Sequence, residues 1–178
     1  LKGFDFSGNE IWSRDIQKDY GAFGLNWGYA SSPALYQDSL YLQVLHGMKT
    51  DDPSYILAIE KNTGRTLWRV ERPTDALGES PDSYTTPLIL NYGDNTELVI
   101  SGGDYVTGHD LRTGEELWRA GNLNPNKASH YRIVASPLVS EGLIYVPSRK
   151  NPLQVFKVGG RGDITESHLV WSTTKGPD

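Results

Sequence analysis

Aromatic and ionisable side chains gather in three short segments, residues 26–30, 82–84 and 130–133, which are the first candidates for ligand contact. Each segment combines rings that can stack with groups that can hydrogen-bond or carry charge. The candidate binding residues are Trp27, Tyr29, Asp82, Tyr84, His130, Tyr131 and Arg132. If the segments converge, they form a polar-aromatic surface suited to a peptide, a sugar or a ring-shaped ligand. The alternative is that these side chains only pack at strand ends beside a water-filled channel.

A loop with His46, Asp51 and Asp52 offers imidazole and carboxylate ligands for a divalent cation. The spacing matches no known metal-binding loop, so a solvated loop is favoured and we predict no metal site. The absence of cysteine excludes a thiolate nucleophile, a disulfide and a Cys-based zinc or iron–sulfur site. His, Ser and Asp residues occur without a nucleophile-elbow context, so we predict no catalytic residue.

Composition and charge argue against several partners. Lys and Arg number 17 against 22 Asp and Glu, and the net charge of −5 argues against a nucleic-acid surface. No stretch approaches the roughly 18 apolar residues that span a bilayer, so no membrane span is predicted. The tripeptide Arg161-Gly162-Asp163 matches an integrin-binding motif, but matches of three residues are common by chance.

The elements that would position these residues are copies of one repeating unit. Four tryptophans stand 56, 50 and 53 residues apart, at Trp12, Trp68, Trp118 and Trp171. A second marker, a proline ahead of an apolar run, recurs after 54 and 50 residues, at Pro33, Pro87 and Pro137. A period of roughly 40–50 residues with such punctuation is typical of propeller blades of four strands. We therefore predict an all-β fold, a β-propeller of four-stranded antiparallel blades.

Runs rich in branched and aromatic residues, bounded by turn residues, predict the strands of three blades. These runs are 33–36, 40–45, 55–59 and 66–70, then 88–90, 97–100, 105–108 and 116–118, then 138–139, 143–146, 153–156 and 168–171. We assign residues 1–178 to part of one propeller domain. It has a partial blade at 1–20 and blades at about 27–72, 81–120 and 130–173. No helical periodicity of useful length is present.

The turn between the third and fourth strands explains the recurring residues. Gly64 and Gly114 supply the positive φ that a tight hairpin with a bulge needs, and Asp110 can accept hydrogen bonds from turn N–H groups. The tryptophan that follows offers a flat surface to a neighbouring blade, worth about 3–5 kcal/mol against Ala if buried. The predicted structural docking residues are Trp12, Gly64, Trp68, Asp110, Gly114, Trp118 and Trp171.

The phrase Ala-x-Asp-x-x-Thr-Gly-x-x-x-Trp, carried with changes at 58–68 and 108–118, resembles the tryptophan-docking motif of the PQQ-like β-propeller repeat family. That family includes quinoprotein dehydrogenases, the propeller lipoprotein of the outer-membrane β-barrel assembly machine and uncharacterised secreted bacterial propellers. The chain departs from the motif at Glu60, Gly108 and Lys157. The last connection is enlarged at 159–167, which either reaches a neighbouring blade or is a tolerated insertion.

The resemblance implies a ring of about seven or eight blades, with binding surfaces at the mouth of a central channel, where the three aromatic segments would lie. Three blades and a partial one cannot close such a ring. The remaining blades are expected from the same, longer chain, with self-association as the less favoured alternative.

The expected function is a non-catalytic scaffold, periplasmic or extracellular, that binds a protein or another extracellular ligand at the channel mouth. The alternative is a segment of a quinone- or metal-dependent oxidoreductase whose catalytic residues lie mainly elsewhere. Pyrroloquinoline quinone (PQQ) and calcium enter only through the resemblance, because the residues of the chain support no cofactor. A third hypothesis is a blade array inside a larger surface protein.

Overall fold

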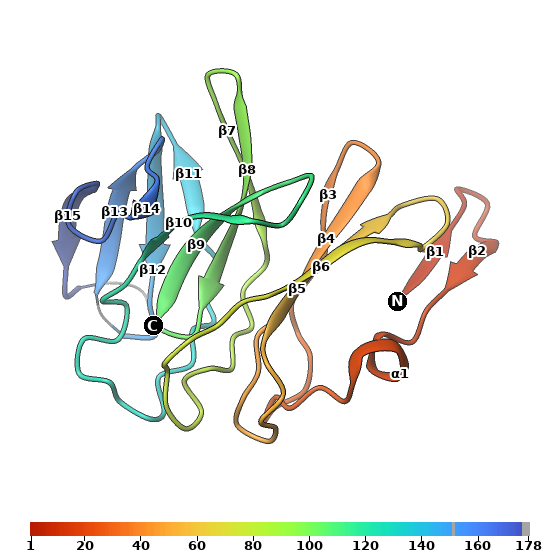
Figure 1. Cartoon of the computed structure of the whole chain (residues 1–178), viewed down its shortest axis with the longest axis horizontal. Helices are drawn as coiled ribbons and strands as arrows, with labels where there is room; N and C mark the ends of the chain where they lie inside the picture. Colours follow the sequence, from red (N-terminus) through yellow and green to blue (C-terminus); the bar gives the residue numbers. More distant parts are fainter. Residues whose placement is uncertain (151, 176–178) are drawn as a thin grey trace.

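The computed structural model describes residues 1–150 and 152–175, and it shows three twisted sheets standing side by side with a short hairpin next to the first (Figure 1). Asn151, inside the predicted third blade, and residues 176–178, at the end of the predicted domain, lie outside the described residues. Each of the three predicted blade intervals contains the four antiparallel strands of one sheet.

Each sheet contains four strands that follow one another along the chain and pair antiparallel, apart from the short β14 described below. The first blade contains β3 (Ala34–Tyr36), β4 (Ser39–Val44), β5 (Tyr55–Glu60) and β6 (Thr66–Glu71). The second contains β7 (Leu88–Tyr92), β8 (Asn95–Gly102), β9 (Tyr105–Asp110) and β10 (Glu116–Ala120). The third contains β11 (Leu138–Ser140), β12 (Leu143–Pro147), β13 (Leu153–Lys157) and β15 (Leu169–Thr173). The prediction of an all-β fold with four-stranded antiparallel blades is confirmed.

The first twenty residues form a hairpin and one short helix. Strands β1 (Lys2–Phe4) and β2 (Glu10–Ser13) pair with each other and lie within the predicted partial blade. The helix α1 (Ile16–Tyr20) begins at Asp15, whose carboxylate accepts the N–H groups of Gln17 and Lys18 as an N-cap. A helix of five residues leaves too short a pattern for periodicity to reveal. Among the described residues no helix is long and apolar enough to cross a membrane.

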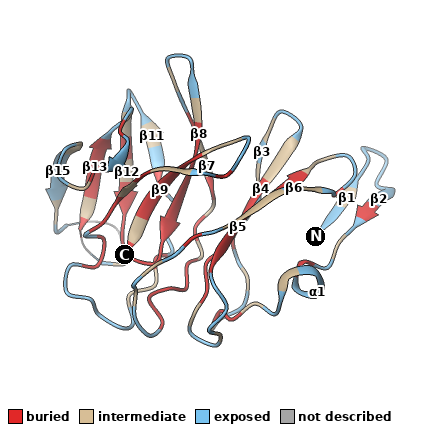
Figure 2. Cartoon of the chain, viewed as in Figure 1, coloured by how far each residue is buried: buried red, intermediate tan, exposed pale blue. Residues whose placement is uncertain are grey.

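The hydrophobic core lies between the sheets, because successive residues of a strand point to opposite faces. Along β5, Tyr55, Leu57 and Ile59 face a cluster that includes Ile16 of α1. The side chains of Ile56 and Ala58 face a second cluster, shared with β8 of the next blade. A third cluster joins the second blade to the third. Figure 2 shows that burial is greatest along the middle strands of the blades.

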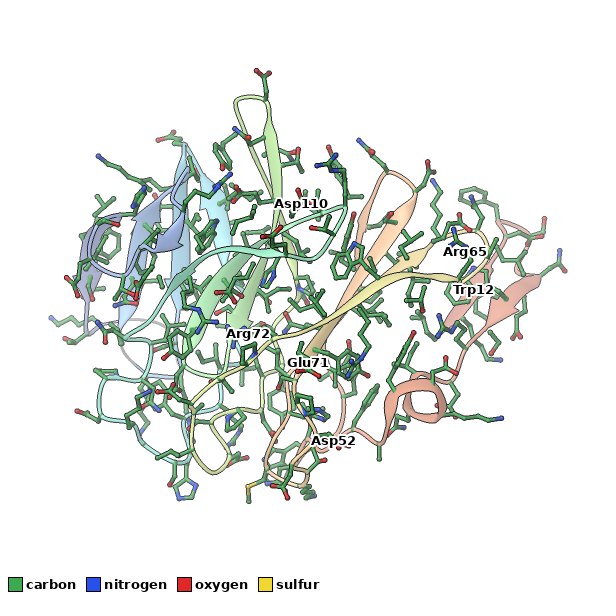
Figure 3. All side chains as sticks on the ribbon, in the orientation of Figure 1. Trp12, Asp52, Arg65, Glu71, Arg72 and Asp110 are labelled. Atoms are coloured by element: carbon green, nitrogen blue, oxygen red, sulfur yellow. The ribbon has the colours of Figure 1, made fainter. Side chains whose placement is uncertain are left out.

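A tryptophan of the hairpin packs on the turn of the first blade. Trp12 donates from Nε1 to the carbonyl oxygen of Lys61 at 2.8 Å, and Figure 3 shows it beside Arg65 at this turn. A Cβ atom at Gly64 would lie 2.5 Å from the Trp12 ring, and the φ of Gly64 is +71°. Both the close approach and the backbone conformation therefore require glycine at this turn.

The next junction repeats this contact. Trp68 of β6 donates to the carbonyl oxygen of Leu111 at 3.0 Å, and a Cβ at Gly114 would lie 2.7 Å from its ring. The turn itself is held by Asp110, whose Oδ1 accepts the N–H groups of Arg112 at 2.8 Å and Thr113 at 3.0 Å. Although burial raises it, these hydrogen bonds lower the pKa of the Asp110 carboxyl below its ordinary value. The repeated sequence phrase thus corresponds to a repeated contact between units.

The third junction is built differently. Trp118 is 1% exposed, and its Nε1 donates to Oε2 of Glu97, in its own blade, at 2.7 Å. The enlarged loop of the third blade reaches back to this point, where Arg161 pairs with Oε1 of the buried Glu97 at 2.8 Å. Strand β14 (Gly162–Asp163) then pairs parallel with β10 and gives the second sheet a fifth strand. The loop therefore packs against the second blade, and its Arg161 is engaged in this contact.

The last tryptophan lies on β15. Trp171 is 42% exposed, and its ring meets Tyr145 edge-on with centroids 6.5 Å apart. In the antiparallel register the residue opposite each tryptophan is Gly3, Ala58, Gly108 and Val155 in turn. A Cβ at Gly108 would lie 2.1 Å from the ring of Trp118. The small residue of the phrase is thus explained by the space that the tryptophan ring occupies.

Candidate functional site

The three aromatic segments that precede β3, β7 and β11 meet at one edge of the molecule. Ser83 and Ile133 form a parallel bridge, and the N–H of Tyr84 donates to the Ile133 carbonyl at 3.0 Å. The N–H of Trp27 donates to the Tyr84 hydroxyl at 3.3 Å. One continuous surface, here called the rim, is formed by residues 26–27, 79–84 and 130–133. The rim lies directly before β3, β7 and β11, the first strands of the three blades, and β3 and β7 are in contact with each other.

The exposed centre of the rim is Trp27. Its side chain is 71% exposed, yet its Nε1 donates to Oε1 of Glu79 at 2.9 Å. The second oxygen of Glu79 pairs with Nη1 of Arg132 at 2.9 Å, and the Arg132 guanidinium lies 5.9 Å from the Trp27 ring centroid. Burial raises the pKa of Glu79, but hydrogen bonds from Trp27 and Asn26 and the Arg132 charge lower it below its ordinary value overall. Glu79 therefore remains ionised and holds the indole in place.

A buried carboxylate supports the rim from beneath. Asp82 is fully buried, and its Oδ1 accepts the N–H groups of Gly47 at 3.0 Å and Met48 at 3.1 Å. Its Oδ2 accepts the N–H of Asn26 at 2.7 Å. Three backbone donors satisfy this charge. Asp82 therefore orders the loops that carry Trp27 and Met48 and is not placed to touch a ligand.

The other candidate residues occupy different positions. Tyr29 does not join the rim: its hydroxyl donates to the Gln43 carbonyl at 3.0 Å, its ring lies 5.0 Å from that of Phe23, and burial raises its pKa. Tyr131 lies at the edge of the rim, with its hydroxyl 3.0 Å from Oγ of Ser148. His130 is exposed at the same edge. The rim thus gathers Trp27, Asp82, Tyr84, Arg132, Tyr131 and His130, and it leaves out Tyr29.

The rim continues into a basic pocket of about 330 Å³, lined by Arg132, Val134, Arg149 and Lys150. Arg149 donates through Nη1 to the carbonyl oxygen of His130. Among the described residues, neither Arg149 nor Lys150 forms an ion pair with a carboxylate, whereas Arg132 is paired with Glu79. The pocket therefore holds more positive than negative charge, although the chain as a whole is acidic.

The possible cation loop is explained by local structure. Nδ1 of His46 accepts the N–H of Gly24 at 3.0 Å, and Nε2 lies 3.3 Å from the Pro53 carbonyl oxygen. Both ring nitrogens are thus engaged within the protein. Asp52 lies in the loops at the lower edge of Figure 3. Within residues 1–150 and 152–175, no group of three or more His, Asp or Glu is arranged to hold a metal ion.

Sequence reasoning missed two buried charged side chains, one in the rim and one at a junction between blades. Glu79 organises the rim, but its equivalents in the other blades are not acidic, so the repeat gave no signal for it. Arg72 is 1% exposed and donates to the carbonyl oxygen of Tyr105 at 2.9 Å, at the junction of the first and second blades (Figure 3). Burial lowers the pKa of Arg72 to about 10. An arginine directly after a strand gives no indication that it will be buried.

Comparison with known proteins agrees with this architecture. The model of a protein family described as outer membrane protein assembly factor BamB matches residues 4–176. The chain therefore belongs to this family of PQQ-like β-propellers. Methanol dehydrogenase [cytochrome c] subunit 1 of Methylorubrum extorquens is 31% identical over 84 residues, which cover 45% of this chain and 13% of that protein. The corresponding subunit of Methylobacterium organophilum is 30% identical over the same length.

Solved structures show the same fold at low sequence identity. A quinohemoprotein alcohol dehydrogenase from Pseudomonas putida HK5 superposes with a TM-score of 0.60 and 18% identity, covering 96% of this chain and 30% of that one. A second, from Comamonas testosteroni, gives a TM-score of 0.55 and 14% identity, covering 82% of this chain and 21% of that one. The chain thus spans less than a third of the length of these proteins.

Quinone and calcium are the groups that this fold family implies, and the calcium ion does not fit the described rim. Calcium needs several oxygen ligands with free lone pairs. The carboxylate of Asp82 is engaged by backbone N–H groups on both oxygens. The carboxylate of Glu79 is engaged by Trp27 and Arg132. The described rim is therefore suited to hydrogen bonding and stacking, and it offers no calcium ligand set.

Proposed function

We propose that the chain is part of a non-catalytic PQQ-like propeller that binds a protein partner at the rim. The observation that carries this proposal is Trp27, an exposed indole fixed by Glu79 and Arg132 from other segments. Binding energy in protein interfaces concentrates in Trp, Tyr and Arg side chains. A side chain that is already immobile loses little conformational entropy on binding, so a fixed Trp27 favours affinity.

The proposal includes the setting of the protein. The match to an outer membrane assembly factor family supports a periplasmic or extracellular location. The partial blade at 1–20 and the blades at about 27–72, 81–120 and 130–173 belong to a ring of about seven or eight blades. The low coverage of the solved relatives supports the remaining blades being part of the same polypeptide. Trp12 and Trp68 dock on the turn of the following unit, and Trp118 is buried in the cluster between the second and third blades. In the proposed ring, Trp171 would dock on the blade that follows the third.

The experiment is purification of the full-length protein with its partner from the source cells. Trp27→Ala is expected to lose the partner, because the largest exposed ring of the rim is removed, while the melting temperature stays unchanged. Arg132→Ala is expected to weaken capture as well, through loss of the side chain that holds Glu79. Phe6→Ala is the matched control, since Phe6 is a fully exposed aromatic residue of the β1–β2 turn.

Normal capture by Trp27→Ala, Tyr84→Ala and Arg132→Ala together would contradict the proposed surface. Loss of capture in Phe6→Ala alone would place the partner at the hairpin edge. Circular dichroism of each variant separates loss of binding from loss of folding.

A second candidate is a segment of a quinone-dependent oxidoreductase. The observation that favours it is the 31% identity to a methanol dehydrogenase subunit over 84 residues. The test is reconstitution of the full-length protein with PQQ and calcium, followed by absorbance spectra and alcohol oxidation with an artificial electron acceptor. A colourless, inactive protein would reject this candidate, and turnover would establish it in place of the scaffold.

A further inference from the structure

We propose that the basic pocket beside Trp27 binds carboxylate side chains, so that the partner presents an acidic segment with an apolar residue next to it. This inference rests on the proposed function, since it describes the chemistry of the partner that the rim recognises. The pocket is lined by Arg132, Val134, Arg149 and Lys150. It shares Arg132 with the Trp27 site, so one bound segment would reach both.

The charge of the pocket is the first argument. Of its three cations, only Arg132 is balanced, by Glu79 at 2.9 Å. Arg149 and Lys150 face no carboxylate among the described residues, and the net charge of the whole chain is −5. An acidic protein that keeps two unpaired cations at one concave position has a local potential opposite to its overall charge. Such a position attracts and orients an anionic group.

Preorganisation is the second argument. The guanidinium of Arg149 is held by the carbonyl oxygen of His130. The N–H of Lys150 donates to the Tyr131 hydroxyl at 3.2 Å, which fixes the backbone from which the lysine side chain extends. A guanidinium binds a carboxylate through paired donors, while an ammonium acts as a point charge. The two residues can therefore receive two neighbouring carboxylates of one peptide.

The apolar component is the third argument. Val134 lines the pocket and is 57% exposed, and Trp27 is 71% exposed at the adjoining position. An apolar side chain of the partner would be covered by these two residues, while the carboxylates meet the cations. Protein interfaces usually have an apolar centre surrounded by polar and charged groups. A small inorganic anion would use only the cations and leave both apolar surfaces uncovered.

The test uses two fluorescein-labelled peptides and the full-length protein. One peptide places Phe between pairs of Glu, and the other has Gln in place of every Glu. Anisotropy titrations are run with wild type and with Arg149→Gln/Lys150→Gln, with Lys18→Gln/Arg65→Gln as the control that removes equal charge from exposed positions elsewhere. We expect the pocket variant to bind the Glu peptide with an affinity about five- to tenfold lower, which is the effect of losing two exposed charge contacts. The control variant should change this affinity little.

Each outcome has a distinct meaning. Equal binding of the Glu and Gln peptides, binding of neither, or equal weakening by the pocket and control variants would overturn the acidic-partner inference. Displacement of the Glu peptide by an equal concentration of inorganic phosphate would also overturn it, since the ligand would then be a small anion. Trp27→Ala is expected to lower the affinity for both peptides. If only this expectation fails, the result contradicts the binding role of Trp27 in the rim and not the role of the basic pocket.

A single charge reversal at Lys150 tests the same contact if the double variant does not fold. Lys150 is exposed, so Lys150→Glu is expected to leave the melting temperature unchanged. It should lower the affinity for the Glu peptide more than Lys150→Gln does. This difference in affinity should shrink at high ionic strength because exposed charges are screened. Equal affinities of these two variants would contradict a direct contact between Lys150 and carboxylates.

Discussion

The hydrogen bond from Trp118 to Glu97 allows a quantitative test of how the second and third blades are joined. Trp118→Phe keeps an aromatic ring but removes the Nε1 donor that lies 2.7 Å from Oε2 of the buried Glu97. A hydrogen bond to a charged group contributes about 1.5–3 kcal/mol to stability, and the lost ring volume adds about 1 kcal/mol. The expected loss is therefore about 2.5–4 kcal/mol in the free energy of unfolding.

Trp68→Phe is the matched comparison. Trp68 donates to a neutral acceptor, the Leu111 carbonyl oxygen, at 3.0 Å and is only partly buried. A neutral hydrogen bond contributes about 0.5–1.5 kcal/mol, so with the same loss of volume the expected cost is about 2 kcal/mol. Urea denaturation followed by circular dichroism measures both free energies without relying on tryptophan fluorescence.

A double-mutant cycle with Glu97→Gln isolates the charged acceptor. In that background Trp118→Phe is expected to cost about 1 kcal/mol less, because the neutral amide gains less from the indole donor. Equal costs for Trp118→Phe and Trp68→Phe, together with no coupling to Glu97, would refute the reasoning that an ionised buried acceptor stabilises this junction.

Three further predictions concern stability. Burial lowers the pKa of His109 to about 4. The stability that the neutral imidazole contributes is fully present above about pH 6.5, and about 3 kcal/mol of it is lost as the pH falls toward 4. The free energy of unfolding should therefore depend more steeply on pH in wild type than in His109→Gln within this window. Gly114→Ala is expected to cost about 1–3 kcal/mol, measured by urea denaturation, because a Cβ would meet the Trp68 ring and φ is +77°. Arg161→Ala leaves Glu97 without its cation and should lower the melting temperature, while Arg161→Lys should recover part of the loss.

The fold was largely predictable because its signals are local and repeated. Trp12 and Trp68 recur at the period of a blade, and their contacts with Gly64 and Gly114 recur in space. The twelve predicted strands match the strands of the three blades to within a few residues at each end. Branched residues and turn glycines act over short distances, so one sequence suffices to read them.

Contacts that occur only once were not predictable. Arg161 pairs with Glu97 across a blade junction, and the described residues hold no equivalent ion pair at the other junctions. Glu79 contacts both Trp27 and Arg132, and each of these lies more than fifty residues away from it along the chain. Tyr29 lies in an aromatic segment like Trp27, but it turns into the core and donates to Gln43. The direction of a single side chain depends on long-range packing, which neither spacing nor residue type reveals.

Oxidative footprinting of Trp27 tests most directly whether the rim is the surface that binds the partner. Hydroxyl radicals modify exposed aromatic side chains, and Trp27 is 71% exposed while Phe6 is fully exposed. The full-length protein would be treated alone and in the complex isolated from source cells, and each residue quantified by mass spectrometry. We expect the partner to protect Trp27 several-fold and to leave Phe6 unchanged. Equal modification of Trp27 in the free protein and in an intact complex would show that the partner does not bind at the rim.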